Sequence, residues 1–200
     1  MRFSGTLLTA LVISLSAAAL PGARAQDSDT PVTPASREQG LAEWEGIHAV
    51  FAHPRCANCH VEDDQPRWSG ESYGKTRVHA FNVRRGEDGF GNAGLRCSTC
   101  HSEENSAVLH GPPGAHAWHL APAEMVWFDK SSAEICAQIK DPERNGGRSL
   151  EDVAHHVRDD ALVAWGWNPG PGREPAPGSA EETFAAIERW AAAGAPCPEE

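Results

Sequence analysis

Two pentapeptides, Cys56-Ala-Asn-Cys59-His60 and Cys97-Ser-Thr-Cys100-His101, decide how this chain is organised. Each has the Cys-X-X-Cys-His pattern that attaches c-type haem. Two cysteines at this spacing can form thioethers to the two vinyl groups on one porphyrin edge. The adjacent histidine then offers a neutral imidazole nitrogen to the iron. Because these patterns use four of the six cysteines, the sequence predicts two covalently bound haems c, with His60 and His101 as proximal ligands.

Other chemistries also use paired cysteines. Two Cys-X-X-Cys pairs can hold a structural zinc ion tetrahedrally, and one pair can act as a thiol–disulfide redox centre. Zinc does not require a histidine directly after the second cysteine in both motifs. A thioredoxin-like centre would lie in a βαβ pattern, which the sequence does not show. We therefore favour haem and keep a zinc-bound structural module as the alternative.

Residues 1–25 have the pattern of a cleavable secretory signal. Arg2 is followed by an apolar run from Leu7 to Leu20, and Ala23-Arg24-Ala25 is a small-X-small cleavage site. The apolar run is shorter than the roughly 20 residues that span a bilayer, and no later segment is apolar enough to do so. Since covalent haem attachment is a chemistry of exported proteins, the sequence predicts a soluble periplasmic protein.

The charge balance limits the partners. The chain carries a formal net charge of −11, and removal of the predicted signal with its two arginines leaves −13. Such an acidic chain is unsuited to nucleic acid and favours a protein partner with a basic docking face.

Four Ser-X-X-Glu/Gln/Asp patterns predict where helices begin. They start at Ser36, Ser131, Ser149 and Ser179, and each precedes apolar residues at helical spacing. We expect the first helix to end at Pro54 and the last at Gly194. Residues 26–35 are polar and proline-containing, which is typical of a disordered lead-in.

The region between the first two of these helices is rich in helix breakers, and the glycine-rich segment 85–94 has two interpretations. Its backbone either passes close to a bulky group such as a haem face or forms a plain surface loop. The two haem motifs are 41 residues apart, less than a separate helical cytochrome domain needs. The sequence therefore predicts a mainly α fold with much irregular structure, in which residues 36–200 form one compact multihaem cytochrome domain with two haems.

Cys136 and Cys197 remain after haem attachment. In an oxidising compartment such a pair favours a disulfide, and two separate buried thiols are the alternative. Arg55 and Arg96, which precede the two motifs, either pair with haem propionates or are solvated. Trp44, Trp118 and Trp127 either pack on a haem or belong to an ordinary aromatic core.

The sequence does not identify the second axial ligand of either iron. The candidates are His53, His79, His119 and Met125. A second group, which we rank lower, consists of His48, His110, His116, His155 and His156. If both positions are filled, the protein is an electron carrier. If one is open, it could be an enzyme such as a dihaem peroxidase, although that class builds each haem a larger domain. A Met/His pair has a higher potential than two histidines.

Several segments resemble a family of small bacterial c-type cytochromes identified as isoquinoline 1-oxidoreductase subunits. Beyond the two motifs, the similar segments are Trp118-His-Leu-Ala-Pro122, Lys140-Asp-Pro-Glu-Arg-Asn-Gly-Gly147, Leu162-Val-Ala-Trp-Gly-Trp167 and Ala193-Gly-Ala-Pro-Cys197. The resemblance implies an exported dihaem cytochrome that accepts electrons from a molybdenum hydroxylase and passes them to a downstream acceptor. It does not imply catalysis by this chain, which has too few cysteines left for an iron–sulfur cluster.

Overall fold

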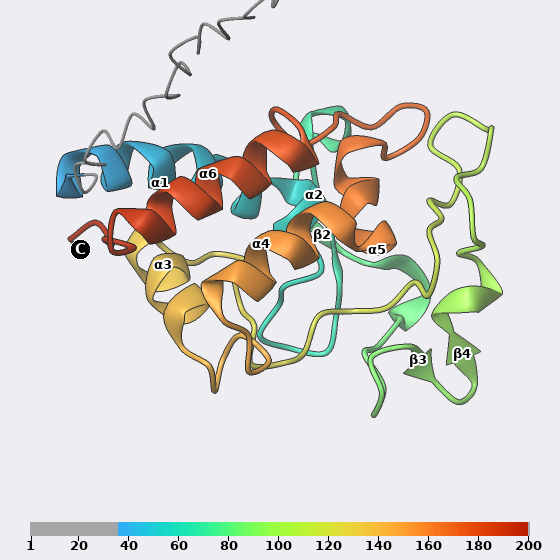
Figure 1. Cartoon of the computed structure of the whole chain (residues 1–200). Helices are drawn as coiled ribbons and strands as arrows, with labels where there is room; N and C mark the ends of the chain where they lie inside the picture. The colour runs from blue at the N-terminus through green and yellow to red at the C-terminus, as the bar shows by residue number, and fades with distance from the viewer. Residues whose placement is uncertain (1–35, 200) are drawn as a thin grey trace, which may run out of the picture. The chain divides into compact units, whose positions relative to one another are not determined.

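The computed structural model describes residues 36–199, which belong to one compact unit of the chain (Figure 1). The predicted signal at 1–25 and the predicted lead-in at 26–35 lie outside the described residues. Among the described residues, no helix has the length and hydropathy to cross a membrane.

The described part of the chain is mainly helical, as the sequence predicts, with long irregular connections. Its α-helices are α1 (Arg37–Phe51), α2 (Pro54–Ala57), α3 (Ser132–Lys140), α4 (Leu150–Asp159), α5 (Ala161–Ala164) and α6 (Ala180–Ala192). Its strands are β1 (Arg67–Trp68), β2 (Arg77–Val78), β3 (Gly91–Asn92) and β4 (Leu95–Arg96), which form the antiparallel pairs β1–β2 and β3–β4.

The four predicted helix starts are confirmed. The serine hydroxyl before α1, α3, α4 and α6 accepts a hydrogen bond from the backbone N–H three residues later. In the first three of these helices, the side chain at that later position bonds back to the serine N–H and completes a capping box. Pro54 has a different role from the one expected, because α1 ends at Phe51 and Pro54 begins α2 behind an N-cap at His53. Proline suits the first position of a helix, because an N–H group there has no acceptor within the helix and its absence costs nothing.

The cap of α4 provides a measurable test of this local argument. Ser149→Ala removes the hydroxyl that accepts from the Asp152 N–H at 3.1 Å. We expect a loss of about 1 kcal/mol in the free energy of unfolding, measured by chemical denaturation. Ser149→Thr keeps an acceptor oxygen and should recover most of that loss. Equal stability of the alanine variant and the parent would contradict the assignment.

The core lies between α1, α3, α4 and α6, which pack together on one side of the unit (Figure 1). Trp44 of α1 and Trp190 of α6 are fully buried, with ring centroids 5.0 Å apart. The Trp44 indole donates to the Ser132 hydroxyl at 2.9 Å. Of the two interpretations of Trp44, the structure therefore supports an ordinary aromatic core.

A disulfide joins α3 to the segment that follows α6. Cys136 and Cys197 are bonded, with Cα atoms 5.6 Å apart, so the predicted pairing is confirmed. Three side-chain hydrogen bonds among the described residues hold the same terminal segment. Lys140 Nζ donates to the Ala195 carbonyl at 2.7 Å, Arg37 to the Cys197 carbonyl at 3.1 Å and the Trp190 indole to the Pro196 carbonyl at 2.9 Å.

The glycine-rich segment folds onto itself to form the hairpin β3–β4. A Cβ at Gly86 would collide with the carbonyl of Gly91, and Gly86 has φ +71. The close contact that requires glycine at position 86 is therefore with the backbone of the same hairpin. Of the two interpretations of this segment, an approach to a haem face is not needed to explain Gly86. The preceding residue, Arg85, is buried and donates to the carbonyls of Val61, Asp63 and Ala121. Arg85 thus links, by hydrogen bonds, the irregular segment that follows the first motif to the one that contains Ala121.

Candidate functional site

Each Cys-X-X-Cys-His motif lines a cavity of its own. Cys56, Cys59 and His60 line a first cavity of about 220 Å³, bounded by residues of α1, α3, α4 and α5. The second motif, 97–101, contributes both cysteines and its histidine to a second cavity of about 600 Å³, bounded mainly by irregular segments. Both cavities have predominantly apolar walls, which suits a flat apolar ligand.

The two cavities adjoin and share a wall. Five residues line both of them, and these are Arg55, Cys59, Trp118, His119 and Trp165. Cys97 also lies close enough to Cys59 for its charge to raise the Cys59 pKa. The fold therefore brings together, within one compact unit, two motifs that are 41 residues apart in the sequence.

The two predicted proximal histidines have matching environments. The Nδ1 atom of His60 donates to the Met125 carbonyl at 3.2 Å, and that of His101 donates to the Pro113 carbonyl at 2.8 Å. With its proton on Nδ1, an imidazole presents its Nε2 lone pair to a metal, and such a hydrogen bond fixes the orientation of a ligating histidine.

A tryptophan lies flat against each of these imidazoles. The ring centroids of His60 and Trp127 are 3.5 Å apart, those of His101 and Trp118 are 4.5 Å apart, and both pairs are parallel within 2°. Stacking covers a face of the imidazole and leaves its edge, where Nε2 lies, accessible. Trp118 and Trp127 therefore lie beside the predicted ligands. Trp127 is also part of the core, where it stacks on Phe51 with ring centroids 4.6 Å apart.

Burial keeps these imidazoles uncharged. It lowers the pKa of His60 to about 3, and nearby positive charges lower it further while the Met125 carbonyl opposes the shift. Burial also lowers the pKa of His101. Both side chains are therefore neutral near pH 7, which is the protonation state that a metal ligand needs.

The four motif cysteines are unpaired thiols in the described structure. Burial raises the pKa of Cys56 to about 12 and that of Cys59 to about 11. Within residues 36–199, no three His, Cys, Asp or Glu side chains gather closely enough to hold a metal ion. The arrangement thus does not favour the zinc alternative, whose four thiolates would have to converge on one point.

Residues that line the first cavity include some with a buried polar atom that has no hydrogen-bond partner in the described structure. Two of these atoms are the indole N–H of Trp127 and the Oε1 atom of Gln138. Arg144 and Arg148 line it too, and neither forms a salt bridge within residues 36–199. An unpartnered donor and two arginines in the lining of one apolar cavity suit a ligand that has an apolar body and carboxylates, such as a haem.

The second cavity has a comparable pair of cations. Arg84 and Arg173 line it. Arg84 donates to the Asn82 side chain at 3.2 Å, and Arg173 donates to the Gly111 carbonyl at 2.5 Å. Neither has a carboxylate partner within the part of the chain that the structure describes. The lining of each cavity therefore combines apolar side chains with arginines that lack a carboxylate partner among the described residues, which is the chemistry that a haem with its propionates would need.

Arg55 and Arg96 are engaged elsewhere, and neither is merely solvated. Arg55 is buried, lies 3.3 Å from a carboxylate oxygen of Glu174 and donates to the Ser69 carbonyl at 2.6 Å. Arg96 makes two hydrogen bonds to the carboxylate of Asp88, at 2.8 and 3.0 Å. Glu174 and Asp88 thus already form the ion pairs with these arginines that haem propionates would otherwise form.

The candidates for the second axial ligand are not equally placed. His79 lines the second cavity, His119 lines both and Met125 lines the first. His53 is absent from the lining of either cavity, and its Nδ1 accepts from the Arg55 N–H to cap α2.

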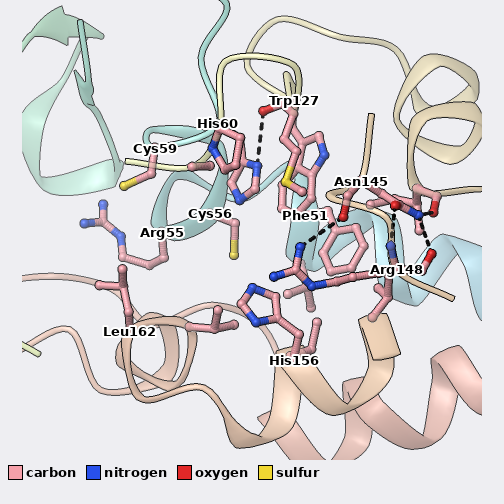
Figure 2. A pocket seen from close by; sticks show the side chains of 18 of the residues that line it. Phe51, Arg55, Cys56, Cys59, His60, Trp127, Asn145, Arg148, His156 and Leu162 are labelled. Atoms are coloured by element: carbon pink, nitrogen blue, oxygen red, sulfur yellow. Dashed lines mark hydrogen bonds between the residues drawn. The ribbon is translucent and has the colours of Figure 1, made fainter. Parts of the chain in front are cut away.

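One histidine that we ranked lower lies in the first cavity. His156, near the end of α4, points into it from the side opposite Cys56 and His60 (Figure 2). A sequence signal for this position exists, because His156 is three residues after Val153 and directly before Val157, both of which are buried. On a helix that spacing places His156 beside the apolar stripe.

Comparisons with known proteins add no relative. No family model, no curated protein and no solved structure matches the chain. The conclusions about function therefore depend on the residues and on the geometry described above.

Proposed function

We propose that this chain is a dihaem c-type cytochrome that transfers electrons in the periplasm. One observation carries the proposal: each Cys-X-X-Cys-His motif lines its own largely apolar cavity, and each motif histidine donates from Nδ1 to a backbone carbonyl while it stacks on a tryptophan. The same construction at two distant points of the sequence is expected of two equivalent cofactor sites.

The residues divide into clear roles. Cys56, Cys59, Cys97 and Cys100 hold the two porphyrins by thioether bonds. His60 and His101 are the proximal iron ligands. Bound haem supplies one-electron chemistry at the iron, and the surrounding side chains set its potential through ligation, hydrogen bonding and burial.

The shared wall supports electron transfer between the two centres. Because Cys59 lines both cavities, porphyrins in these cavities lie near each other within one compact unit. An electron accepted at one centre can then leave from the other. A peroxidase-like enzyme would instead keep one iron open to a small molecule.

The redox partners follow from charge and from the family resemblance. An acidic chain suits a partner with a basic docking face. We propose a molybdenum hydroxylase-type dehydrogenase as electron donor and a respiratory protein as acceptor. This chain itself is not proposed to oxidise the heterocyclic substrate.

The proposal is tested on full-length protein exported from a bacterial host that has the haem-attachment machinery. Intact mass, iron content and the absorbance of the pyridine-treated protein should together give two haems per chain that resist extraction by acidified organic solvent. The protein should also take up two electrons per chain in a reductive titration. A purified protein without c-type absorbance, or with zinc in place of iron, would overturn the proposal.

A further inference from the structure

We propose that each iron has a histidine as its second axial ligand, His156 opposite His60 and His79 opposite His101. This inference rests on the proposed function and goes further, because it fixes the coordination of both irons. Two closed coordination spheres make the protein an electron carrier and exclude an open site for a small molecule.

Two histidines of the second cavity have the separation that an axial pair needs. An iron between two imidazole nitrogens requires two metal–nitrogen bonds of about 2.0 Å, which separates the ring centroids by roughly 6 Å once the ring radii are added. The ring centroids of His79 and His101 are 6.0 Å apart. Both side chains line the same cavity.

The hydrogen bonds of this pair agree with that role. The Nδ1 atom of His79 donates to the Ala80 carbonyl at 3.0 Å, and the Nδ1 atom of His101 donates to the Pro113 carbonyl. Each ring is therefore oriented through Nδ1, which leaves two Nε2 lone pairs for a shared metal.

His156 occupies the corresponding place in the first cavity. It projects from α4 toward the cavity while the Cys56 and His60 side chains project from the opposite wall (Figure 2). Its Nδ1 lies 3.5 Å from a carboxylate oxygen of Asp160, which again leaves Nε2 for a metal. Because Val153 and Val157 of the same helix are part of the core, α4 holds His156 at a fixed position.

The other candidates for the first iron have competing contacts. The carbonyl of Met125 accepts from His60 Nδ1, so its backbone lies behind the imidazole. Its methyl group lies against Gly146, where an added Cβ would be only 2.9 Å away. The His119 ring stacks on Phe90 with centroids 4.8 Å apart and belongs to the wall between the cavities.

Carbon monoxide binding to the ferrous protein tests both assignments. The wild-type holoprotein should bind none at either haem. His156→Ala and His79→Ala should each gain one carbon monoxide per chain, and each should convert one of two low-spin ferric signals to high spin. The controls are His155→Ala, next to His156 but exposed and paired with Asp159, and His116→Ala, exposed and paired with Glu103. Neither control should bind carbon monoxide.

Methionine variants keep the test decisive if an alanine variant does not fold. His156→Met and His79→Met supply another ligand and should remain closed, while the reduction potential of the altered haem rises. The near-infrared charge-transfer band of that haem should change from the bis-histidine type to the methionine type.

Three results would overturn the inference. Wild-type protein that contains two haems and binds carbon monoxide would show an open iron. If His119→Ala or Met125→Leu opened the first haem and His156→Ala did not, His156 would not be its ligand. An unchanged spectrum in both His79→Ala and His79→Met would remove His79 from the second haem. Failure of the proposed function is distinguishable, because the wild-type protein would then contain no haem at all.

Discussion

Replacing Cys97 and Cys100 together by alanine is expected to give a folded protein with one covalent haem, while the same change at Cys56 and Cys59 should also cost much of the stability. The cause is the location of the two cavities. The first is bounded by core residues such as Phe51, Ile139 and Val157, whereas irregular segments form most of the second. An empty first cavity therefore leaves core side chains without packing partners.

Intact mass and thermal unfolding followed by circular dichroism measure both effects. Each double variant should lose the mass of one haem and half of the c-type absorbance. The midpoint of unfolding should fall further for the Cys56/Cys59 variant. Loss of both haems from the Cys97/Cys100 variant would show that the two cavities are not separate sites. Equal stability of the two variants would show that the first cavity contributes no more to core packing than the second.

The second large effect concerns the disulfide between Cys136 and Cys197. The bond closes a loop with a sequence separation of 61 residues. Its removal by the double change to alanine restores the conformational entropy of that loop in the unfolded chain. We expect a loss of about 4 kcal/mol from the loop-closure relation. For a chain of this size, that corresponds to a midpoint of thermal unfolding lower by about 10 °C.

A matched comparison separates the bond from the side chains. Wild-type protein treated with reductant should unfold close to the temperature of the double alanine variant, and the haem content of both should be unchanged. The hydrogen bonds of Lys140 and Arg37 to the terminal segment remain in either case. A midpoint that moves by less than about 2 °C, which is under about 1 kcal/mol for a chain of this size, would show that contacts other than the disulfide fix the segment.

The parts of the structure that could be predicted from the sequence are those that depend on short-range chemistry. Ser36, Ser131, Ser149 and Ser179 mark helix starts because a cap is completed within three residues. The pairing of the two remaining cysteines followed from their number and the expected compartment.

The parts that could not be predicted depend on partners far away in the chain. The carboxylate that engages Arg55 belongs to Glu174, 119 residues later. The helical spacing places His156 beside the buried Val153 and Val157, but it does not reveal which residues face it. The structure shows that the helix carrying it packs against α6 and borders the first cavity. Arg85 likewise looked like part of a loop, although its guanidinium bonds to carbonyls on two other segments.

The shared wall between the cavities also limits how the protein can vary. Trp118 and Trp165 border both cavities, so a substitution at either one alters the polarity and solvent access around two cofactors at once. Burial and local polarity are among the factors that set a haem potential. Adaptation to a donor of different potential would therefore shift the two centres together at these positions, and separate tuning is left to residues that border a single cavity.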